Sequence, residues 1–296
     1  MGINKISKQS IIGFVGIGVM GASMARHILN KGYTLHTYNR SPEKAKALIK
    51  DGAIFQENLK DLAEACNIII TIVGFPSDVQ EIYFADHGLL KNSKPGTVFI
   101  DMTTSAPQLA IEIDKCAKEK QMYALDAPIS GGDIGAKNAT LSIMIGGDKE
   151  VYDATQPLLE CLGSNIVYQG DTGSGQHTKM ANQIVVATNM LGVCEALIYA
   201  KKTGLNQKKV LESISKGAAG SWALSNLAPR ILEENFDPGF FVKHFIKDMC
   251  MALESAKEYG FETPALKVAL EQYYKLADMG FENDGTHGLY KVYNKD

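Results

Sequence analysis

The sequence predicts a two-domain protein, in which an α/β domain with a doubly wound, mostly parallel sheet is followed by an all-α domain. Three observations support this prediction. The chain has 296 residues, which exceeds the size at which one hydrophobic core usually keeps growing. From residue 11 to about residue 170, short apolar runs alternate with helical patterns, as in successive βαβ units. Beyond that point long segments with a helical period replace the alternation.

The apolar runs of the first half predict the strands of the sheet. They cover residues 11–15, 34–38, 68–73, 97–101, 122–125, 141–145 and 166–168. Helical segments between them include residues 42–50 and 107–120, and each begins with a proline, which the first turn of a helix tolerates. In the second half, helical patterns cover residues 174–203, 207–216, 242–260 and 264–280. We therefore divide the chain into domains 1–172 and 173–296, with a long helix leading from one to the other.

Composition excludes several classes of function. The net charge is -3, so the chain has no basic excess for binding the phosphates of a nucleic acid. The cysteines form an odd set without a C-x-x-C pair, and none has a histidine at metal-ligand spacing. We expect reduced thiols, no metal and a cytoplasmic location. The cysteines are Cys66, Cys116, Cys161, Cys194 and Cys250.

The N-terminus superficially resembles a signal peptide, because Lys5 and Lys8 precede an apolar run over residues 11–25. Glycines interrupt this run at spacings that suit a phosphate-binding turn rather than a secretory helix. No other apolar stretch approaches the roughly 20 residues of a membrane span. We therefore expect neither secretion nor a membrane partner.

The hexamer Gly16-Ile17-Gly18-Val19-Met20-Gly21 closes the first predicted strand and opens a helix. In that context a G-x-G-x-x-G motif binds a dinucleotide. Its first glycine permits a tight turn, its second lets the backbone approach the pyrophosphate, and its third allows close packing of helix on strand. A merely flexible glycine turn is the alternative. We interpret the first domain as an NAD(P)-binding Rossmann domain.

The second predicted strand ends at Asn39-Arg40-Ser41, where domains that select NAD carry Asp or Glu for the ribose 2′-hydroxyl. No carboxylate is present there to repel a phosphate. Arg40 can pair with a 2′-phosphate as a planar charged fork, helped by Asn39 and Ser41. A solvated surface arginine is the alternative, so the pattern favours NADP and leaves NAD possible.

Two further loops follow predicted strands. Asp101-Met102-Thr103-Thr104-Ser105 places hydroxyls where ligands bind in open α/β sheets, although Thr104 or Ser105 would equally serve to cap the helix that begins at Pro107. The loop Asp126-Ala127-Pro128-Ile129-Ser130-Gly131-Gly132 presents a hydroxyl and unobstructed backbone N–H groups, which suit a carboxylate.

One face of the long helix carries Lys179, Asn182, Gln183 and Val186, at positions i, i+3, i+4 and i+7. A lysine and amides on a largely apolar helix are either solvated or committed to a site. Desolvation would lower the pKa of Lys179 toward the range useful for proton transfer, which is how lysines become acid–base catalysts.

Taken together, these motifs resemble the β-hydroxyacid dehydrogenases, typified by 3-hydroxyisobutyrate dehydrogenase. The resemblance covers nearly the whole chain. It rests on the glycine motif extended to Met24-Ala25, the Asp-Met-Thr-Thr strand end, the Asp-Ala-Pro-Ile-Ser-Gly-Gly loop, residues 173–182 and Lys247-Asp248, in the family's order and spacing.

The resemblance implies a role for each matching residue. Lys179 would be the general acid and base, Asp248 would support Lys247, and hydride would pass between NAD(P) and a small β-hydroxyacid. The substrate would be bound by Ser130, Gly131, Gly132, Asn182 and Gln183. The expected cofactor-binding residues are Gly16, Gly18, Val19, Met20, Gly21, Asn39, Arg40, Ser41, Val73, Thr104 and Lys247. The second domain would complete the substrate site and carry the contacts of a homo-oligomer.

Two departures leave the substrate open. Gln183 replaces a second asparagine that the family often has after Asn182, and Asp284-Gly285-Thr286-His287 matches the family's C-terminal segment only loosely. The alternatives are an NADPH-dependent reductase of glyoxylate, succinic semialdehyde or tartronate semialdehyde, and a non-catalytic nucleotide-binding scaffold. The retention of Lys179 argues against the scaffold, and against the related imine reductases, which would have another residue at that position.

Overall fold

The computed structural model describes residues 6–294. Two compact units divide the chain, the first ending at Lys179 and the second beginning at Met180. The predicted domain boundary lies before residue 173, whereas the first turns of the long helix belong with the first unit. Hydrogen bonds from these turns to two loops of the sheet, described below, account for this grouping.

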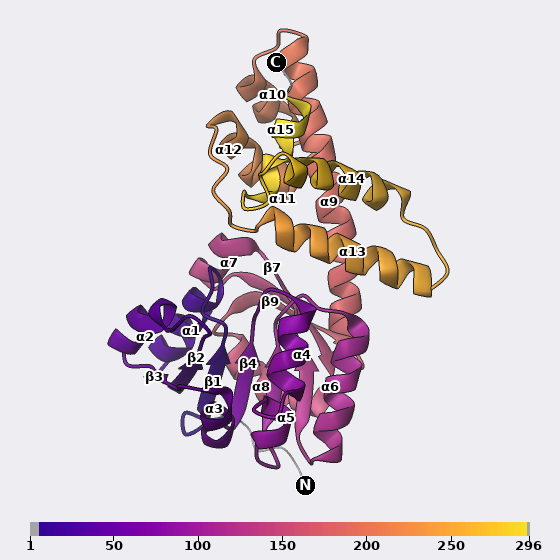
Figure 1. Cartoon of the computed structure of the whole chain (residues 1–296). Helices are drawn as coiled ribbons and strands as arrows, with labels where there is room; N and C mark the ends of the chain where they lie inside the picture. Colours follow the sequence, from indigo (N-terminus) through magenta and orange to yellow (C-terminus); the bar gives the residue numbers. More distant parts are fainter. Residues whose placement is uncertain (1–5, 295–296) are drawn as a thin grey trace. The chain divides into compact units, whose positions relative to one another are not determined.

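The first unit is built on one sheet, and the prediction of a doubly wound, mostly parallel sheet is confirmed (Figure 1). Strand β1 (Ile11–Val15) pairs in parallel with β2 (Thr34–Tyr38) on one side and with β4 (Ile68–Thr71) on the other. Outside these lie β3 (Ile54–Phe55) next to β2, and β5 (Val98–Asp101) and β6 (Tyr123–Asp126) beyond β4, all parallel. Because β2 and β4 flank β1 and run parallel to it, the segments that follow these three strands lie close together at the carboxyl end of the sheet.

The far edge of the sheet runs in the opposite direction. Strand β8 (Leu141–Gly147) is antiparallel to both β6 and β7 (Ile129–Ser130), and β9 (Gly163–Gly170) is parallel to β8. The apolar runs predicted β8 and β9 but not their direction. The two-residue strands β3 and β7 were not predicted, because two residues carry no readable alternation.

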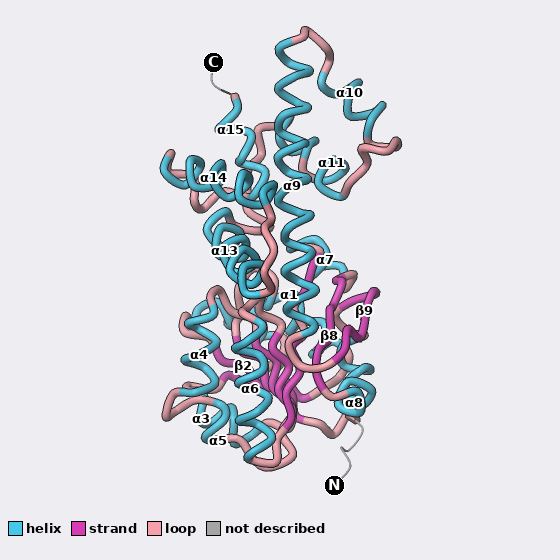
Figure 2. The backbone as a smooth tube through the Cα atoms, turned by 90° about the vertical axis from the view of Figure 1, so that its right-hand side faces the viewer, coloured by secondary structure: helices cyan, strands magenta, loops and turns pink. Residues whose placement is uncertain are grey.

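Helices cover both faces of this sheet, as Figure 2 shows for α3, α4 and α5 on one side of the strands and α8 on the other. Strand β1 is buried on both faces, so Phe14 packs into one hydrophobic core and its neighbour Val15 into another. The helical elements are α1 (Gly21–Asn30), η1 (Pro42–Ala45), α2 (Lys46–Lys50), α3 (Leu59–Ala65), α4 (Pro76–Phe84), α5 (Leu89–Asn92), α6 (Pro107–Glu119), α7 (Gly132–Asn138) and α8 (Lys149–Leu159).

The second unit is helical, as predicted. Helix α9 runs from the first unit into the second, and the short helices α11, α12 and α15 were not predicted because four or five residues show no period. The elements are α9 (Ser174–Lys202), α10 (Gln207–Ile214), α11 (Trp222–Asn226), α12 (Ala228–Leu232), α13 (Val242–Glu258), α14 (Pro264–Asp278), η2 (Thr286–Leu289) and α15 (Tyr290–Tyr293).

Helix α9 corrects one expectation. It contains a window of mean hydropathy 1.5, so by length and composition it is apolar enough to cross a membrane. The sequence analysis overlooked it because polar residues interrupt the apolar ones and no continuous run results. Core helices of globular proteins pass the same test, so length and composition alone do not make α9 a membrane span.

Candidate functional site

The glycine turn between β1 and α1 has the geometry that its motif predicts. Gly16 has φ of 102°, and a Cβ there would lie 1.9 Å from the Ile72 carbonyl oxygen. A Cβ on Gly21 would lie 1.9 Å from the carbonyl oxygen of Gly16, so the start of α1 packs directly on the turn. Beside Gly18, by contrast, a Cβ would meet no heavy atom within 4 Å. The backbone is therefore open at Gly18, which fits the approach of a pyrophosphate to the N-terminus of α1.

Asn39 joins this turn to the end of β2. Its side-chain oxygen accepts a hydrogen bond from Ile17 N at 2.8 Å, and its side-chain nitrogen donates to the carbonyl oxygen of Ser41 at 2.8 Å. Contact between Asn39 and the cofactor stays a prediction. The contacts in the structure show that its amide fixes the shape of the glycine turn.

Arg40 has an acidic partner that the sequence analysis missed. Its Nη1 lies 3.0 Å from Asp78 Oδ1, with the arginine side chain 72% exposed and the aspartate 14% exposed. Asp78 lies in the first turn of α4, far along the chain from the end of β2. No local motif marks such a residue, because only the neighbouring positions of β2, β1 and β4 bring it to Arg40.

The loop after β5 is a hydrogen-bonded network rather than a row of free hydroxyls. Asp101 Oδ1 accepts from Thr71 Oγ1 at 2.7 Å and from Thr103 N at 3.1 Å, and Thr103 Oγ1 accepts from Val73 N at 3.0 Å. Thr103 is buried, whereas Thr104 is half-buried. The N-cap of α6 is Ala106, rather than Thr104 or Ser105 as the capping alternative supposed. Contact between Thr104 and a ligand stays a prediction.

Burial raises the pKa of the Asp101 carboxyl from 3.8 to about 6, although hydrogen bonds from Thr71 and Thr103 lower it. Between about pH 4 and pH 6 the folded protein therefore binds a proton that the unfolded chain does not. This contribution stabilises the fold at acid pH and is lost as the pH rises through 6. We expect it to amount to up to about 3 kcal/mol.

The measurement is urea unfolding of the wild type and Asp101→Asn across this pH range. Asparagine keeps an acceptor for Thr71 and Thr103 but does not titrate. We expect the stability of the wild type relative to the variant to decline from pH 4 to pH 6 and to level off above. Parallel pH profiles for the two proteins would contradict the raised pKa.

The start of α9 is hydrogen-bonded to the segment that follows β5 and to the last residue of β6. Asp126, at the end of β6, accepts from Gly173 N and from Gln176 N, both at 2.8 Å. The Gln176 side chain accepts from Ser105 N at 3.0 Å and donates to the Thr103 carbonyl oxygen at 2.7 Å. Gln176 is 0% exposed and Asp126 2% exposed. This role of Asp126 and Gln176 was not predicted, since it depends on side chains pairing between segments that are distant in the sequence.

Lys179 lies one turn further along α9 and is only 6% exposed. Its Nζ donates a hydrogen bond to the Ile129 carbonyl oxygen at 2.8 Å. The next residues, Ser130, Gly131 and Gly132, form the predicted carboxylate loop, in which both glycines have positive φ. The structure therefore brings two predicted parts of the site together within the first unit.

In the second unit, Gln183 and Lys247 share a partner. Gln183 Nε2 donates to Asp248 Oδ2 at 2.6 Å, and Lys247 Nζ lies 2.8 Å from Asp248 Oδ1. Asn182 Nδ2 donates to Gln183 Oε1 at 2.7 Å. The 1%-exposed carboxylate of Asp248 thus orients the Lys247 ammonium and, through Gln183, the amide of Asn182.

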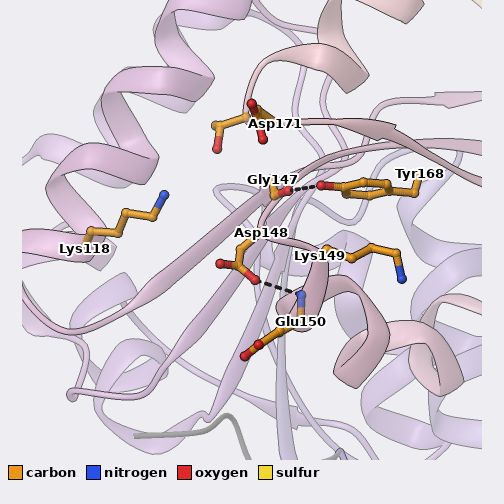
Figure 3. A pocket seen from close by; sticks show the side chains of 8 residues that line it. Lys118, Gly147, Asp148, Lys149, Glu150, Tyr168 and Asp171 are labelled. Carbon is orange, nitrogen blue, oxygen red and sulfur yellow. Dashed lines mark hydrogen bonds between the residues drawn. The ribbon is translucent and has the colours of Figure 1, made fainter.

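A pocket of about 420 Å³ lies elsewhere in the first unit, and its lining includes Lys118, Asp148, Lys149 and Tyr168 (Figure 3). None of the predicted site residues lines it. Three of its charged side chains have structural partners, since Lys118 pairs with Asp114, Lys149 with Asp153, and Asp148 caps α8. We assign it no function.

Comparison with known families covers both units. Residues 11–170 match the family described as the NAD binding domain of 6-phosphogluconate dehydrogenase. Residues 173–293 match the family described as NAD-binding of NADP-dependent 3-hydroxyisobutyrate dehydrogenase. The first match takes in the glycine turn, Arg40 and the loops after β5 and β6, and the second takes in Lys179 and Lys247.

Similar proteins support the same assignment. The uncharacterized oxidoreductase YkwC of Bacillus subtilis is 56% identical over 97% of this chain and 100% of its own. A 3-hydroxyisobutyrate dehydrogenase-like protein of Arabidopsis thaliana is 44% identical over 94% of this chain and 83% of its own. The 2-hydroxy-3-oxopropionate reductase of Escherichia coli is 37% identical over 91% of this chain and 92% of its own.

Among solved structures, the 3-hydroxyisobutyrate dehydrogenase of Mycobacterium tuberculosis with L-serine superposes with a TM-score of 0.87. It is 26% identical, and the match covers 97% of this chain and 100% of that one. The fold, both family matches and these relatives agree. The chain therefore belongs to the β-hydroxyacid dehydrogenase family, as an NAD(P)-dependent oxidoreductase of the 3-hydroxyisobutyrate dehydrogenase type.

Proposed function

We propose that this protein interconverts a small β-hydroxyacid, of the 3-hydroxyisobutyrate class, and its semialdehyde, with Lys179 as general acid and base and NADP as the preferred cofactor. The observation that carries the proposal is the position of Lys179. Its ammonium is buried and hydrogen-bonded to the residue that precedes Ser130, so one lysine stands next to a loop suited to a carboxylate.

Each part of the site has a distinct task in this proposal. The cofactor, when bound, supplies or accepts the hydride. Backbone N–H groups at Gly131 and Gly132 and the hydroxyl of Ser130 hold the substrate carboxylate. Lys179 Nζ takes the proton of the substrate hydroxyl on oxidation and returns it on reduction. Asn182, one helical turn from Lys179, orients the substrate, and its amide is itself held through Gln183.

A reductive role is the second candidate, and Arg40 is the observation that favours it. An arginine at the end of β2 suits NADP, the cofactor that commonly serves reduction. The relative from Escherichia coli is named for the reduction of 2-hydroxy-3-oxopropionate, which is tartronate semialdehyde. Glyoxylate and succinic semialdehyde are further candidates of the same chemical class.

A steady-state screen by cofactor absorbance tests both candidates. It pairs NAD(H) and NADP(H) with 3-hydroxyisobutyrate, serine, glyoxylate, succinic semialdehyde and tartronate semialdehyde. Fast oxidation of 3-hydroxyisobutyrate is the expected result, and a strong preference for reducing one aldehyde with NADPH would favour the second candidate. Absence of turnover with every pair would contradict both and would revive the non-catalytic scaffold.

Cofactor preference gives a separate prediction at Arg40. We expect Arg40→Ala to raise the dissociation constant for NADPH about tenfold or more and to leave that for NADH nearly unchanged, because the lost charge-assisted hydrogen bonds contact only the 2′-phosphate. Quenching of protein fluorescence by each cofactor measures both constants. Equal effects on the two cofactors would refute a contact between Arg40 and the 2′-phosphate.

A further inference from the structure

Asp78 places a negative charge at the carboxyl end of the sheet, where the cofactor's ribose is expected. β2 and β4 are the two neighbours of β1, so the segments that follow them flank the glycine turn. Arg40 comes from the first of these segments and Asp78 from the second, and their ion pair joins the two sides. Residues 39–41, which follow β2, contain no carboxylate, but the carboxylate of Asp78 reaches Arg40 from the start of α4.

The two side chains of this ion pair differ in how firmly the rest of the protein holds them. Asp78 is held at its place in α4, because its Oδ2 accepts from Phe75 N at 3.1 Å and its own backbone N–H donates to the Phe75 carbonyl oxygen at 3.0 Å. Its side chain is 14% exposed. Arg40 reaches it with a long side chain that is 72% exposed. Any ligand that recruits Arg40 therefore binds a guanidinium that already has a fixed carboxylate as its partner.

A 2′-phosphate carries close to two negative charges at neutral pH and would compete directly for that guanidinium. It would also lie within a few ångströms of the Asp78 charge, and like charges at that distance repel. A ribose 2′-hydroxyl neither competes for the guanidinium as an anion nor repels the Asp78 charge. A carboxylate can instead accept a hydrogen bond from it. The fixed charge therefore opposes NADP and tolerates NAD.

We propose that Asp78 is a selectivity residue for the cofactor: its carboxylate competes with the 2′-phosphate of NADP for Arg40 and so weakens the preference for NADP that Arg40 provides. This inference rests on the proposed contact between Arg40 and the 2′-phosphate. It predicts that removing the carboxylate strengthens the binding of NADP, whereas removing the arginine weakens it.

The test uses Asp78→Asn and two nucleotides that differ only in the 2′-phosphate, adenosine 2′,5′-bisphosphate and adenosine 5′-monophosphate. Asparagine retains an oxygen that accepts from Phe75 N and loses the charge. Isothermal titration measures both dissociation constants without turnover. We expect the constant for the bisphosphate to fall roughly fivefold, as for loss of an exposed ion pair, and that for the monophosphate to stay unchanged.

Asp51→Asn is the matched control, because Asp51 also pairs with an arginine, Arg26, at 2.9 Å in the same unit. It changes the net charge equally and should leave the ratio of the two constants at the wild-type value. Asp78→Ser is a second variant, which loses the charge and keeps a hydroxyl acceptor. Raising the salt concentration should reduce the gain seen in Asp78→Asn.

Arg40→Ala separates this inference from the proposal beneath it. If Arg40→Ala weakens only bisphosphate binding while Asp78→Asn and Asp78→Ser keep the wild-type ratio, Asp78 merely caps α4 and the inference is overturned. If Arg40→Ala also keeps the wild-type ratio of the two dissociation constants, the arginine does not bind the 2′-phosphate. The proposed role of Arg40 and the inferred role of Asp78 would then both be wrong.

Discussion

Lys179→Ala is expected to lower kcat by about a thousandfold, since proton transfer by a positioned side chain contributes roughly 100- to 10,000-fold. The structure supports a large effect because the lysine is buried beside the Ser130 loop and held there by the Ile129 carbonyl. Dissociation constants for the cofactor should change by less than about twofold, because none of the glycine turn is altered. Stopped-flow measurement of a single turnover separates the chemical step from binding.

Lys202→Ala is the control, since this exposed lysine lies at the other end of the same helix. It should react at the wild-type rate. A small primary amine added to Lys179→Ala should restore part of the lost rate if the missing group is a proton carrier. Unchanged turnover in Lys179→Ala, with the fold intact by circular dichroism, would exclude the lysine from catalysis.

The second large effect is expected from Gly175→Ala, which we predict to destabilise the protein by about 3 kcal/mol or more. The added Cβ would lie 2.4 Å from the Met144 carbonyl oxygen and 2.7 Å from that of Asp126. Both oxygens belong to the backbone of the sheet and have little room to move. The start of α9 would have to lift away, breaking the hydrogen bonds between Asp126 and the helix N-terminus.

Gly192→Ala provides a matched control within α9. A Cβ there meets no heavy atom within 4 Å, so the substitution should stabilise the helix by about 1 kcal/mol, the difference in helix propensity between glycine and alanine. Urea unfolding followed by circular dichroism compares the two variants with the wild type. Equal stability of Gly175→Ala and the wild type would mean that α9 can shift without cost, and that its contacts do not fix Lys179.

The sequence predicted those parts of the fold that depend on local pattern. Strands β1 and β2 begin and end at the predicted residues, because turn-forming residues such as Gly16, Gly32 and Asn39 bound them. The reversed direction of β8 was not predictable, since a strand's residues reveal burial but not which neighbour it pairs with. The glycine turn, like β1 and β2, was predictable from local sequence, because its conformation is determined by residues adjacent in the chain.

Contacts between distant segments account for what the sequence left out of the site. The role of Gln176 was not predicted, yet its side chain hydrogen-bonds to both Thr103 and Ser105. The role of Asp78 was not predicted either, because nothing near it in the sequence indicates an ion pair with Arg40. Such pairs depend on the order of strands in the sheet, which the strand pattern alone does not determine.

The hydrogen bond from Lys179 to the Ile129 carbonyl makes no demand on the charge of the lysine. An ion pair with a carboxylate would lose most of its strength once the ammonium gave up its proton. A peptide carbonyl, by contrast, accepts an N–H from a neutral amine as well as from an ammonium. If the lysine alternates between these two forms in each catalytic cycle, this hydrogen bond is kept in both, and it can hold the side chain beside the Ser130 loop from one proton transfer to the next.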